Sequence, residues 1–429
     1  MKVSVDSIGC RLNQAEMRSL GWQLEEKGAE LVQSFEESDV IVLNTCTVTA
    51  AAAADSRSRI RAFRRKYPSA RLIVTGCWAT MEPNEAARLS GTQNVVLNEE
   101  KGSIAERILH NINAISEQPT TRRKPSFRRT RAFIKVQDGC SNHCAYCITT
   151  IARGQSRSIP VAQVLNQILR EVKAGVKEIV LTGVQLNSYG RDLKNTNLGT
   201  LVETILQNTA VPRIRLSSLE PWGLPENFFM LWQSPRLCRH LHLPLQSGCN
   251  ATLRRMRRPY TVSQYEKLIK RALVCIPGAA ISTDIITGFP GETENEFEQS
   301  LSFIRQSDFA HGHVFSYSPR SQTPAAAMPG RVTERIVKER THRMQAAIHK
   351  KQETFRSKAL NTQLEVLWER SVRTQEGTWL VSGWSDTYLR VQAESDMDLS
   401  NEISRVLIER SAGRKLMGRI LDETSQDHI

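Results

Sequence analysis

The chain has 429 residues, of which 40% are hydrophobic and 24% are charged. This composition is typical of globular proteins and excludes a disordered or fibrous chain, and the length predicts roughly three domains. Residues 360–429 carry 8 Lys and Arg against 12 Asp and Glu, so the formal net charge of +14 leaves an excess of +18 on residues 1–359. Such an excess favours a polyanionic partner, most simply nucleic acid, although a basic enzyme whose charge serves only solubility would share it.

No apolar run approaches the roughly 18 residues of a membrane span. The first six residues also lack the layout of a signal peptide. We therefore expect a cytoplasmic protein without membrane contact. The nine cysteines are an odd number in such a chain, which disfavours a disulfide framework and favours metal binding or redox chemistry for clustered cysteines.

Residues 1–115 alternate short apolar strands with helices. Strands are expected at 3–5, 40–43 and 72–74, and helices are expected at 13–27 and 57–67. This alternation predicts a Rossmann-like α/β domain, which is a parallel sheet covered by helices.

Residues 116–131 are expected to form a basic linker. Between 119 and 135 there are two prolines, which disfavour a helix, and no acidic residue. A solvated tether would have this composition too, but we favour a phosphate-binding strip because so dense a run of charge repels itself without an anion nearby. The seven basic residues of the strip are Arg122, Arg123, Lys124, Arg128, Arg129, Arg131 and Lys135.

Residues 132–358 repeat a strand followed by a helix about six times, with a helix at 160–174 as one example. Six units predict a partial (β/α)6 barrel, in which ligands collect at the carboxyl ends of the strands. Residues 359–429 lose the helical rhythm, and strands at 364–367, 379–381, 389–391 and 416–421 predict a small β-barrel. The strands expected in the central barrel are 133–136, 179–181, 214–216, 240–243, 281–286 and 314–317.

Cys140, Cys144 and Cys147 follow the first strand of the central barrel with the spacing C-x3-C-x2-C. So short a loop can wrap three thiolates around one [4Fe–4S] cluster, which usually has four cysteine ligands. The fourth iron would then stay open to a small chelating molecule. A zinc site with His143 as fourth ligand is the alternative, but zinc sites normally pair two knuckles and no second knuckle is visible.

Three further cysteines, Cys10, Cys46 and Cys77, each stand just past a predicted strand of the amino-terminal sheet. The carboxyl ends of parallel strands lie at one edge of a sheet, so these cysteines can converge in space. A second iron–sulfur cluster with an open iron is the interpretation that we favour. Taken one at a time, each cysteine could instead be a small buried hydrophobic residue.

The C-x3-C-x2-C spacing resembles the signature of the radical S-adenosylmethionine (SAM) superfamily, and Tyr146 stands where that signature places an aromatic residue. Nearly the whole chain resembles the radical SAM methylthiotransferases, and its last segment resembles their TRAM module, which holds RNA. The resemblance is carried by residues 9–16, 44–49, 75–77, 181–184, 215–221, 242–248 and 284–292.

This resemblance implies two [4Fe–4S] clusters and two molecules of SAM per product. The cluster on Cys140, Cys144 and Cys147 would cleave SAM to a 5′-deoxyadenosyl radical. The cluster on Cys10, Cys46 and Cys77 would carry the sulfur, which a second SAM methylates. The chain is most similar to the branch that modifies C2 of N6-threonylcarbamoyladenosine next to the anticodon, which implies the tRNA anticodon stem-loop and a low-potential electron donor such as flavodoxin or ferredoxin as partners.

Gly183, Ser218, Glu220 and Gly288 lie at strand ends where the superfamily contacts SAM, so with Tyr146 they are the candidate cofactor-binding residues. The glycines would equally suit turns that need unusual backbone angles. No catalytic residue beyond the cluster ligands is assigned. Candidate substrate contacts in the run after the last barrel strand, which would also suit a capped loop, are Tyr317, Arg320 and Thr323.

The chain departs from the family in two places. Residues 148–154 lack the proline and aromatic that often precede Ala-Arg-Gly there, which affects the wall of the SAM or substrate site. The TRAM-like segment is net acidic, so phosphate contacts are better expected from the basic strip and the helix at 335–358. The basic residues of that helix are Arg335, Lys338, Arg340, Arg343, Lys350, Lys351, Arg356 and Lys358.

Other functions remain as alternatives. Sister branches modify isopentenyladenosine in tRNA or an aspartate of a ribosomal protein. A cobalamin-dependent radical methyltransferase usually offers a histidine ligand in a loop, whereas the one histidine before residue 115 is His110, far from the strand ends. A non-enzymatic iron–sulfur module that binds RNA would leave the barrel motifs unexplained.

Overall fold

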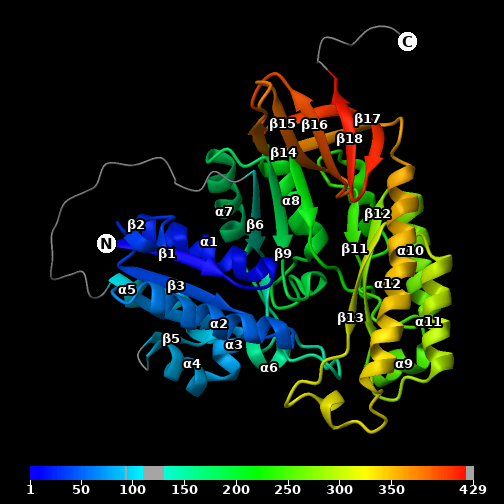
Figure 1. Cartoon of the computed structure of the whole chain (residues 1–429), viewed down its shortest axis with the longest axis horizontal. Helices are drawn as coiled ribbons and strands as arrows, with labels where there is room; N and C mark the ends of the chain where they lie inside the picture. Colours follow the sequence, from blue (N-terminus) through cyan, green and yellow to red (C-terminus); the bar gives the residue numbers. More distant parts are fainter. Residues whose placement is uncertain (92–93, 110–129, 422–429) are drawn as a thin grey trace.

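The computed structural model describes residues 1–91, 94–109 and 130–421, and its amino-terminal part is a parallel five-stranded sheet with helices on both faces (Figure 1). The strand order is β2-β1-β3-β4-β5. The strands are β1 (Lys2–Ser7), β2 (Glu30–Leu31), β3 (Val40–Thr45), β4 (Arg71–Gly76) and β5 (Val95–Val96). The helices are α1 (Arg11–Glu26), α2 (Ala50–Lys66), α3 (Cys77–Met81), α4 (Pro83–Ser90) and α5 (Ile104–Leu109).

Strand β3 begins with four apolar residues and is buried along its whole length, as is typical of a central parallel strand. Leu20 and Leu24 of α1 pack in one apolar cluster with Val42. Ile60 and Phe63 of α2 pack in a second cluster that belongs to the other face. The predicted Rossmann-like domain is therefore confirmed.

The central part is an open barrel of six parallel strands. It consists of two three-stranded sheets, β10-β9-β6 and β11-β12-β13. Two parallel bridges connect these sheets, one from Ile214 to Leu237 and one from Ser218 to His242. The strands are β6 (Arg131–Lys135), β9 (Glu178–Thr182), β10 (Arg213–Leu216), β11 (His240–His242), β12 (Ala280–Thr287) and β13 (His311–Ser316). The predicted partial (β/α)6 barrel is confirmed.

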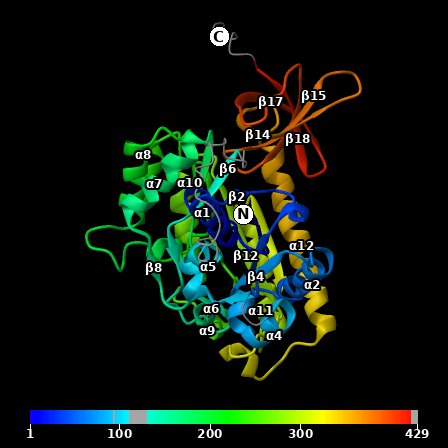
Figure 2. The same ribbon diagram turned by 90° about the vertical axis from the view of Figure 1, so that its left-hand side faces the viewer.

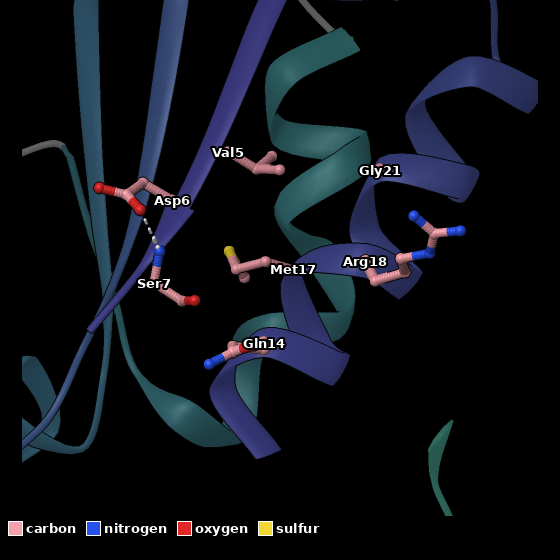
Figure 3. A pocket seen from close by; sticks show the side chains of 7 residues that line it. All are labelled: Val5, Asp6, Ser7, Gln14, Met17, Arg18 and Gly21. Atoms are coloured by element: carbon pink, nitrogen blue, oxygen red, sulfur yellow. Dashed lines mark hydrogen bonds between the residues drawn. The ribbon is translucent and has the colours of Figure 1, made fainter. Parts of the chain in front are cut away.

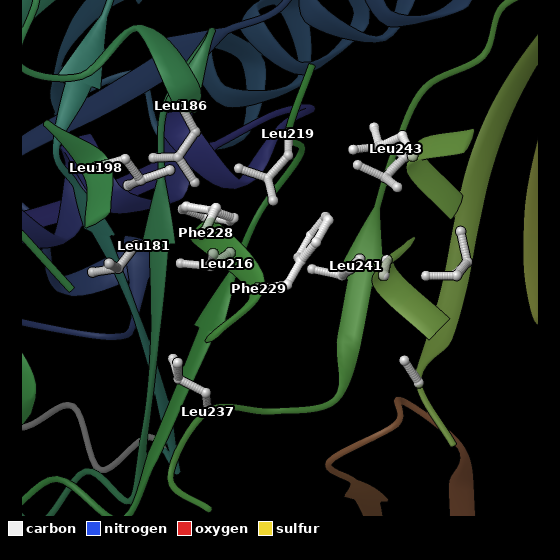
Figure 4. Close-up of a cluster of buried hydrophobic side chains, with 14 of the residues drawn as sticks. Leu181, Leu186, Leu198, Leu216, Leu219, Phe228, Phe229, Leu237, Leu241 and Leu243 are labelled. Atoms are coloured by element: carbon white, nitrogen blue, oxygen red, sulfur yellow. The ribbon is translucent and has the colours of Figure 1, made fainter. Parts of the chain in front are cut away.

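Helices cover the outside of this barrel and bury a large apolar core, part of which is shown in Figure 4. In that core Leu181 and Leu216, from neighbouring strands, pack with Phe228 and Phe229. Three of the helices begin with a capping box. The helices are α6 (Thr149–Arg153), α7 (Val161–Lys173), α8 (Leu198–Asn208), α9 (Asn250–Arg255), α10 (Val262–Cys275), α11 (Glu294–Gln306) and α12 (Glu334–Ser357), and β7 (Gln137–Asp138) pairs with β8 (Arg157–Ser158) outside the barrel.

The carboxyl-terminal part is a closed five-stranded β-barrel at one end of the molecule (Figures 1 and 2). Its strand order is β14-β15-β16-β18-β17, and its core surrounds the fully buried Trp368. The sequence predicts the small barrel correctly but misses β17, in which charged residues interrupt the apolar ones. The strands are β14 (Gln363–Arg373), β15 (Trp379–Ser385), β16 (Arg390–Ser395), β17 (Ile403–Ala412) and β18 (Lys415–Ile420). None of the described helices is long and apolar enough to cross a membrane.

Tyr388, in the turn between β15 and β16, joins the three parts of the chain. Its hydroxyl accepts hydrogen bonds from Arg11 of α1 at 2.8 Å and from Arg131 of β6 at 3.3 Å. Its ring stacks on His240 of β11 with the centroids 4.9 Å apart, and the Arg215 guanidinium lies 4.6 Å from the ring centre. Because Arg131 and His240 begin their strands, the small barrel closes the amino-terminal end of the central barrel.

We expect the substitution Tyr388→Ala to lower the free energy of unfolding by about 2–3 kcal/mol, because it removes the stacked ring as well as both hydrogen bonds. Tyr388→Phe keeps the ring and should cost only about 1–2 kcal/mol. Urea titrations followed by tryptophan fluorescence measure both effects. Met397→Ala, an exposed position on the same small barrel, is the control, and an equal midpoint for Tyr388→Ala and this control would contradict the role of Tyr388.

Candidate functional site

Cys140, Cys144 and Cys147, here called the barrel cysteines, lie in the loop between β7 and α6 at the carboxyl end of the first barrel strand. The loop folds tightly, because the amide of Cys147 donates to the carbonyl of Cys144 at 3.1 Å. Backbone amides also donate to two of the sulfurs: Asn142 to Cys140 and Thr149 to Cys147, both at 3.4 Å. Hydrogen bonds to sulfur of this kind are one way in which proteins tune iron–sulfur clusters.

The barrel cysteines are close enough to interact electrostatically. The pKa of Cys140 is raised to about 11, mainly by burial and to a smaller extent by the neighbouring thiols of Cys147 and Cys144. Burial also raises the pKa of Cys144, but Arg258 lowers it. The thiols of Cys140 and Cys144 therefore resist ionisation in the protein alone, and a metal that binds them must displace their protons.

Cys10, Cys46 and Cys77, here called the sheet cysteines, follow β1, β3 and β4, which are neighbours in the sheet. Two glycines allow them to approach. A Cβ atom on Gly9 would stand 2.5 Å from the sulfur of Cys46, and one on Gly76 would stand 2.3 Å from the carbonyl oxygen of Thr45. Only a residue without a side chain fits either position, so the strand ends close in on one another.

Electrostatic interactions confirm that the sheet cysteines converge, as the topology of parallel strands predicts. The pKa of Cys46 is raised to about 11, mainly by burial and to a smaller extent by the thiols of Cys10 and Cys77. The charge of Arg153 opposes this rise. Each cysteine group thus consists of three mutually close thiols, which is the donor set that a [4Fe–4S] cluster with one open iron requires.

The alternative zinc site with His143 requires ligands that surround one metal ion. Within the part of the chain that the structure describes, no group of three His, Cys, Asp or Glu side chains is arranged to hold one metal ion. A lone zinc ion needs every thiolate about 2.3 Å from one point, whereas each thiolate of a cubane binds a different iron. The geometry therefore does not favour the zinc site with His143.

Two buried arginines at the cysteine groups were not predicted as site residues. Arg153, at the end of α6, donates from Nε to the sulfur of Cys77 at 3.2 Å. Arg258, just after α9, donates to the sulfur of Cys144 at 3.2 Å. The Ala-Arg-Gly run that contains Arg153 was visible in the sequence, but nothing in it pointed to a cysteine of another domain.

The predicted SAM contacts lie around the barrel cysteines. The Tyr146 ring packs edge-on against Phe289 at 6.4 Å, and Glu220 forms an ion pair with Arg258. Ser218 forms the bridge to His242. Tyr146, Glu220 and Ser218 are therefore candidates for contact with SAM.

The two glycines among these candidates are required by the packing of the protein itself. A Cβ on Gly183 would meet Oε1 of Gln137 at 2.9 Å. Gly288 has φ +73°, and a Cβ there would meet Val337 of α12 at 2.4 Å. Gly288 therefore has the unusual backbone angle of the turn interpretation, whereas Gly183 does not and is explained by its close approach to Gln137.

The run after β13 reaches the sheet cysteines. Cys46 acts electrostatically on Arg320, while burial lowers the pKa of this arginine. Nε and Nη2 of Arg320 and the hydroxyl of Tyr317 are buried without a hydrogen-bond partner, so polar groups of a ligand could pair with them. Thr323 instead donates to the carbonyl of Arg320 at 2.8 Å, which is the capped loop that the sequence allowed.

Several basic residues expected to contact phosphate are engaged elsewhere. Arg131 pairs with Glu369, and Lys135 pairs with Glu16 and Asp138, so the structure contradicts a phosphate role for these two. The rest of the strip, 122–129, and His110 lie outside the described residues. On α12, Arg340 is buried against Glu292 and Glu294, and Arg343 pairs with Glu294 and Glu298, whereas Arg335, Lys338, Lys350 and Lys358 are exposed.

A separate cavity of about 270 Å³ lies between β1 and α1 (Figure 3). Its described lining consists of β1 and α1 residues, among them Asp6, Gln14 and Arg18, and contains no cysteine. It is therefore distinct from both cysteine groups.

Comparisons with known proteins agree with this geometry. Residues 2–98 match the model of the uncharacterized protein family UPF0004, and residues 134–304 match that of the radical SAM superfamily. Among solved structures, the cobalamin-containing radical SAM methyltransferase TsrM from Kitasatospora setae is similar with a TM-score of 0.58 and 15% identity, over 76% of this chain and 77% of that one. This likeness concerns the fold alone.

Two curated relatives cover almost the whole chain. The threonylcarbamoyladenosine tRNA methylthiotransferase MtaB of Bacillus subtilis is 36% identical over 100% of this chain and 98% of its own. The tRNA-2-methylthio-N(6)-dimethylallyladenosine synthase of Natranaerobius thermophilus is 30% identical over 97% and 96%. At this identity and coverage, with both cysteine groups in place, the chain belongs to the family of radical SAM methylthiotransferases.

Proposed function

We propose that this protein adds a methylthio group to C2 of N6-threonylcarbamoyladenosine next to the anticodon of tRNA. Relatives from four bacteria that carry the corresponding name are 33–36% identical over 85–100% of the chain. The observation that carries the proposal is the short path between the two cysteine groups. Helix α6 begins two residues after Cys147 and ends at Arg153, which donates to the sulfur of Cys77, so one short helix connects the loop of the barrel cysteines to a contact with the sheet cysteines.

The match to the radical SAM superfamily implies SAM and a [4Fe–4S] cluster. We propose that the barrel cysteines hold that cluster and that the sheet cysteines hold a second one. When bound, the two clusters would supply the electron that cleaves SAM and the sulfur that is transferred. Tyr146, Ser218 and Glu220 remain our candidates for contact with SAM.

The chain's own residues would position the reactants. Arg258 and Glu220 form a charged pair beside Cys144, within reach of a zwitterion such as the amino acid portion of SAM. Arg320, with two unpaired buried nitrogens beside Cys46, suits the carboxylate of the threonylcarbamoyl group.

We further propose domain limits, surroundings and partners. Residues 1–115 would form the domain of the sheet cysteines, 116–131 a basic linker, 132–358 the radical SAM core and 359–429 the TRAM-like barrel. The anticodon stem-loop of tRNA would be the substrate, and flavodoxin or ferredoxin the electron donor. A cytoplasmic location follows from such a substrate.

A second candidate substrate is isopentenyladenosine in tRNA. Relatives named for the dimethylallyladenosine product are 29–32% identical over 80–98% of the chain. The two substrates share the adenine and differ in the N6 group, which is apolar in this case. The two buried, unpaired nitrogens of Arg320 would be poorly matched to an apolar group, so we favour the threonylcarbamoyl substrate.

The number of clusters can be measured directly. Anaerobic reconstitution should give about eight irons per chain, because a cubane contains four and we propose two. Replacing all three sheet cysteines by alanine should leave about four irons, and so should replacing all three barrel cysteines. Cys275→Ala is the matched control, because this cysteine is exposed and belongs to neither group. A wild-type value of about four irons would contradict the second cluster.

The substrate can be identified from tRNA. In a strain that lacks the gene, we expect the methylthio form of N6-threonylcarbamoyladenosine to disappear and N6-threonylcarbamoyladenosine without the methylthio group to accumulate. The wild-type gene and Cys275→Ala should restore it, whereas Cys77→Ala and Cys144→Ala should not, because each group would lose a ligand. Mass analysis of tRNA nucleosides provides the readout. Loss of methylthio-isopentenyladenosine instead would support the second candidate.

A further inference from the structure

We propose that Arg153 and Arg258 are positioning residues, each holding one thiolate of one cluster, and that Arg153 gives the sheet-cysteine cluster the more positive surroundings of the two. This inference rests on the proposed function, because it takes both cysteine groups as cluster ligands. It concerns residues of the chain outside the two cysteine groups themselves.

Arg153 is buried, and its hydrogen bonds hold its side chain in one position. Its side chain is 3% exposed, and besides Cys77 it donates to Glu16 at 2.9 Å and to Asp138 at 2.8 Å. Nη2 also donates to the side-chain oxygen of Asn13 at 2.8 Å. Since these partners occupy the guanidinium nitrogens around Nε, the Nε–H is left directed at the sulfur of Cys77.

The charges around Arg153 do not cancel. Lys101 and Lys135 both reach Glu16, and Lys135 also reaches Asp138. This cluster of side chains thus contains three cations and two carboxylates, which leaves one positive charge in excess next to Cys77. The group is largely shielded from water, so the excess charge acts at short range with little screening.

Arg258 contacts a barrel cysteine as Arg153 contacts a sheet cysteine, but the charges around the two arginines differ. Its side chain is 2% exposed, it donates to Cys144, and it pairs with Glu220. Its guanidinium also lies 4.4 Å from the ring centre of Trp222, which holds it in place. One cation and one carboxylate balance each other here, so no comparable excess remains.

The two arrangements predict different behaviour of the two clusters. A cubane with three thiolates gains negative charge when it takes up an electron, so a positive excess favours its reduced state. The sheet-cysteine cluster should therefore have the higher reduction potential. Removing the charge of Arg153 should make reduction of the sheet-cysteine cluster less favourable. Removing the charge of Arg258 should likewise make reduction of the barrel-cysteine cluster less favourable.

Single-cluster proteins allow each arginine to be tested on each cluster. One protein has all barrel cysteines replaced by alanine, and the other has all sheet cysteines replaced. Arg153→Gln, Arg153→Lys and Arg258→Gln are introduced into both. Bound iron and the midpoint potential, from a redox titration followed by electron paramagnetic resonance, are the readouts, and neither depends on turnover.

In the protein that keeps only the sheet cysteines, we expect Arg153→Gln to lower the equilibrium constant for reduction of the cluster about tenfold, or to halve the bound iron. A tenfold change in this constant lowers the midpoint potential by about 59 mV for one electron. Arg153→Lys keeps the charge and should recover most of the potential. Arg258→Gln should leave this cluster unchanged. In the protein that keeps only the barrel cysteines, Arg258→Gln should have this effect and Arg153→Gln should leave the cluster unchanged.

Arg18→Gln is the control for a purely structural effect. Arg18 of α1 donates from Nε to Glu171 of α7 at 2.7 Å, so it also joins the sheet domain to the barrel through a buried ion pair, and it lines the cavity between β1 and α1, whose described lining contains no cysteine. An equal shift for Arg18→Gln and Arg153→Gln, or no change for Arg153→Gln, would overturn the inference. If the sheet cysteines bind no iron even with Arg153 intact, the two-cluster proposal itself is wrong and the inference falls with it.

Discussion

The carboxylate of Glu16 is the point on which the relation between the two cysteine groups depends. A buried charge is stable only when it is paired, and this one is paired with cations from the sheet domain and from the barrel. Burial alone would raise the pKa of Glu16, but the charges of Lys101, Arg153 and Lys135 outweigh it and hold that pKa well below its ordinary value. Moving the two domains apart would break the ion pairs of Glu16 with Lys135 and Arg153, so these pairs hold Arg153 in position against Cys77.

The sequence was sufficient for the parts of the site that follow from local pattern and topology. Strands β3 and β4 contain apolar runs, β1 alternates polar and apolar residues, and the carboxyl ends of parallel strands lie at one edge, so the convergence of Cys10, Cys46 and Cys77 could be predicted from the sequence. The barrel cysteines share one loop, which makes their proximity a matter of spacing. By contrast, β17 alternates charged and apolar residues irregularly, and its place is set by pairing with β14 and β18.

Contacts between residues far apart in the chain could not be predicted in this way. Arg153 and Glu16 are 137 residues apart, and nothing periodic connects them. For the same reason the basic run predicts a phosphate contact at Arg131, whereas its partner in the structure is Glu369, 238 residues away. A run of basic residues shows where charge is concentrated, but whether a given cation faces solvent or an internal carboxylate depends on the tertiary fold.

The acidic balance of the carboxyl-terminal barrel has a structural explanation of this kind. Glu369 pairs with Arg131, Asp386 with Arg239, and Glu402 with Lys177. All three cations stand at or just before the first residues of barrel strands, so the acids of the small barrel match the basic amino-terminal end of the central barrel. Part of the negative charge of residues 360–429 is therefore directed at the rest of the chain, and the net charge of this segment does not describe the surface that it offers to RNA.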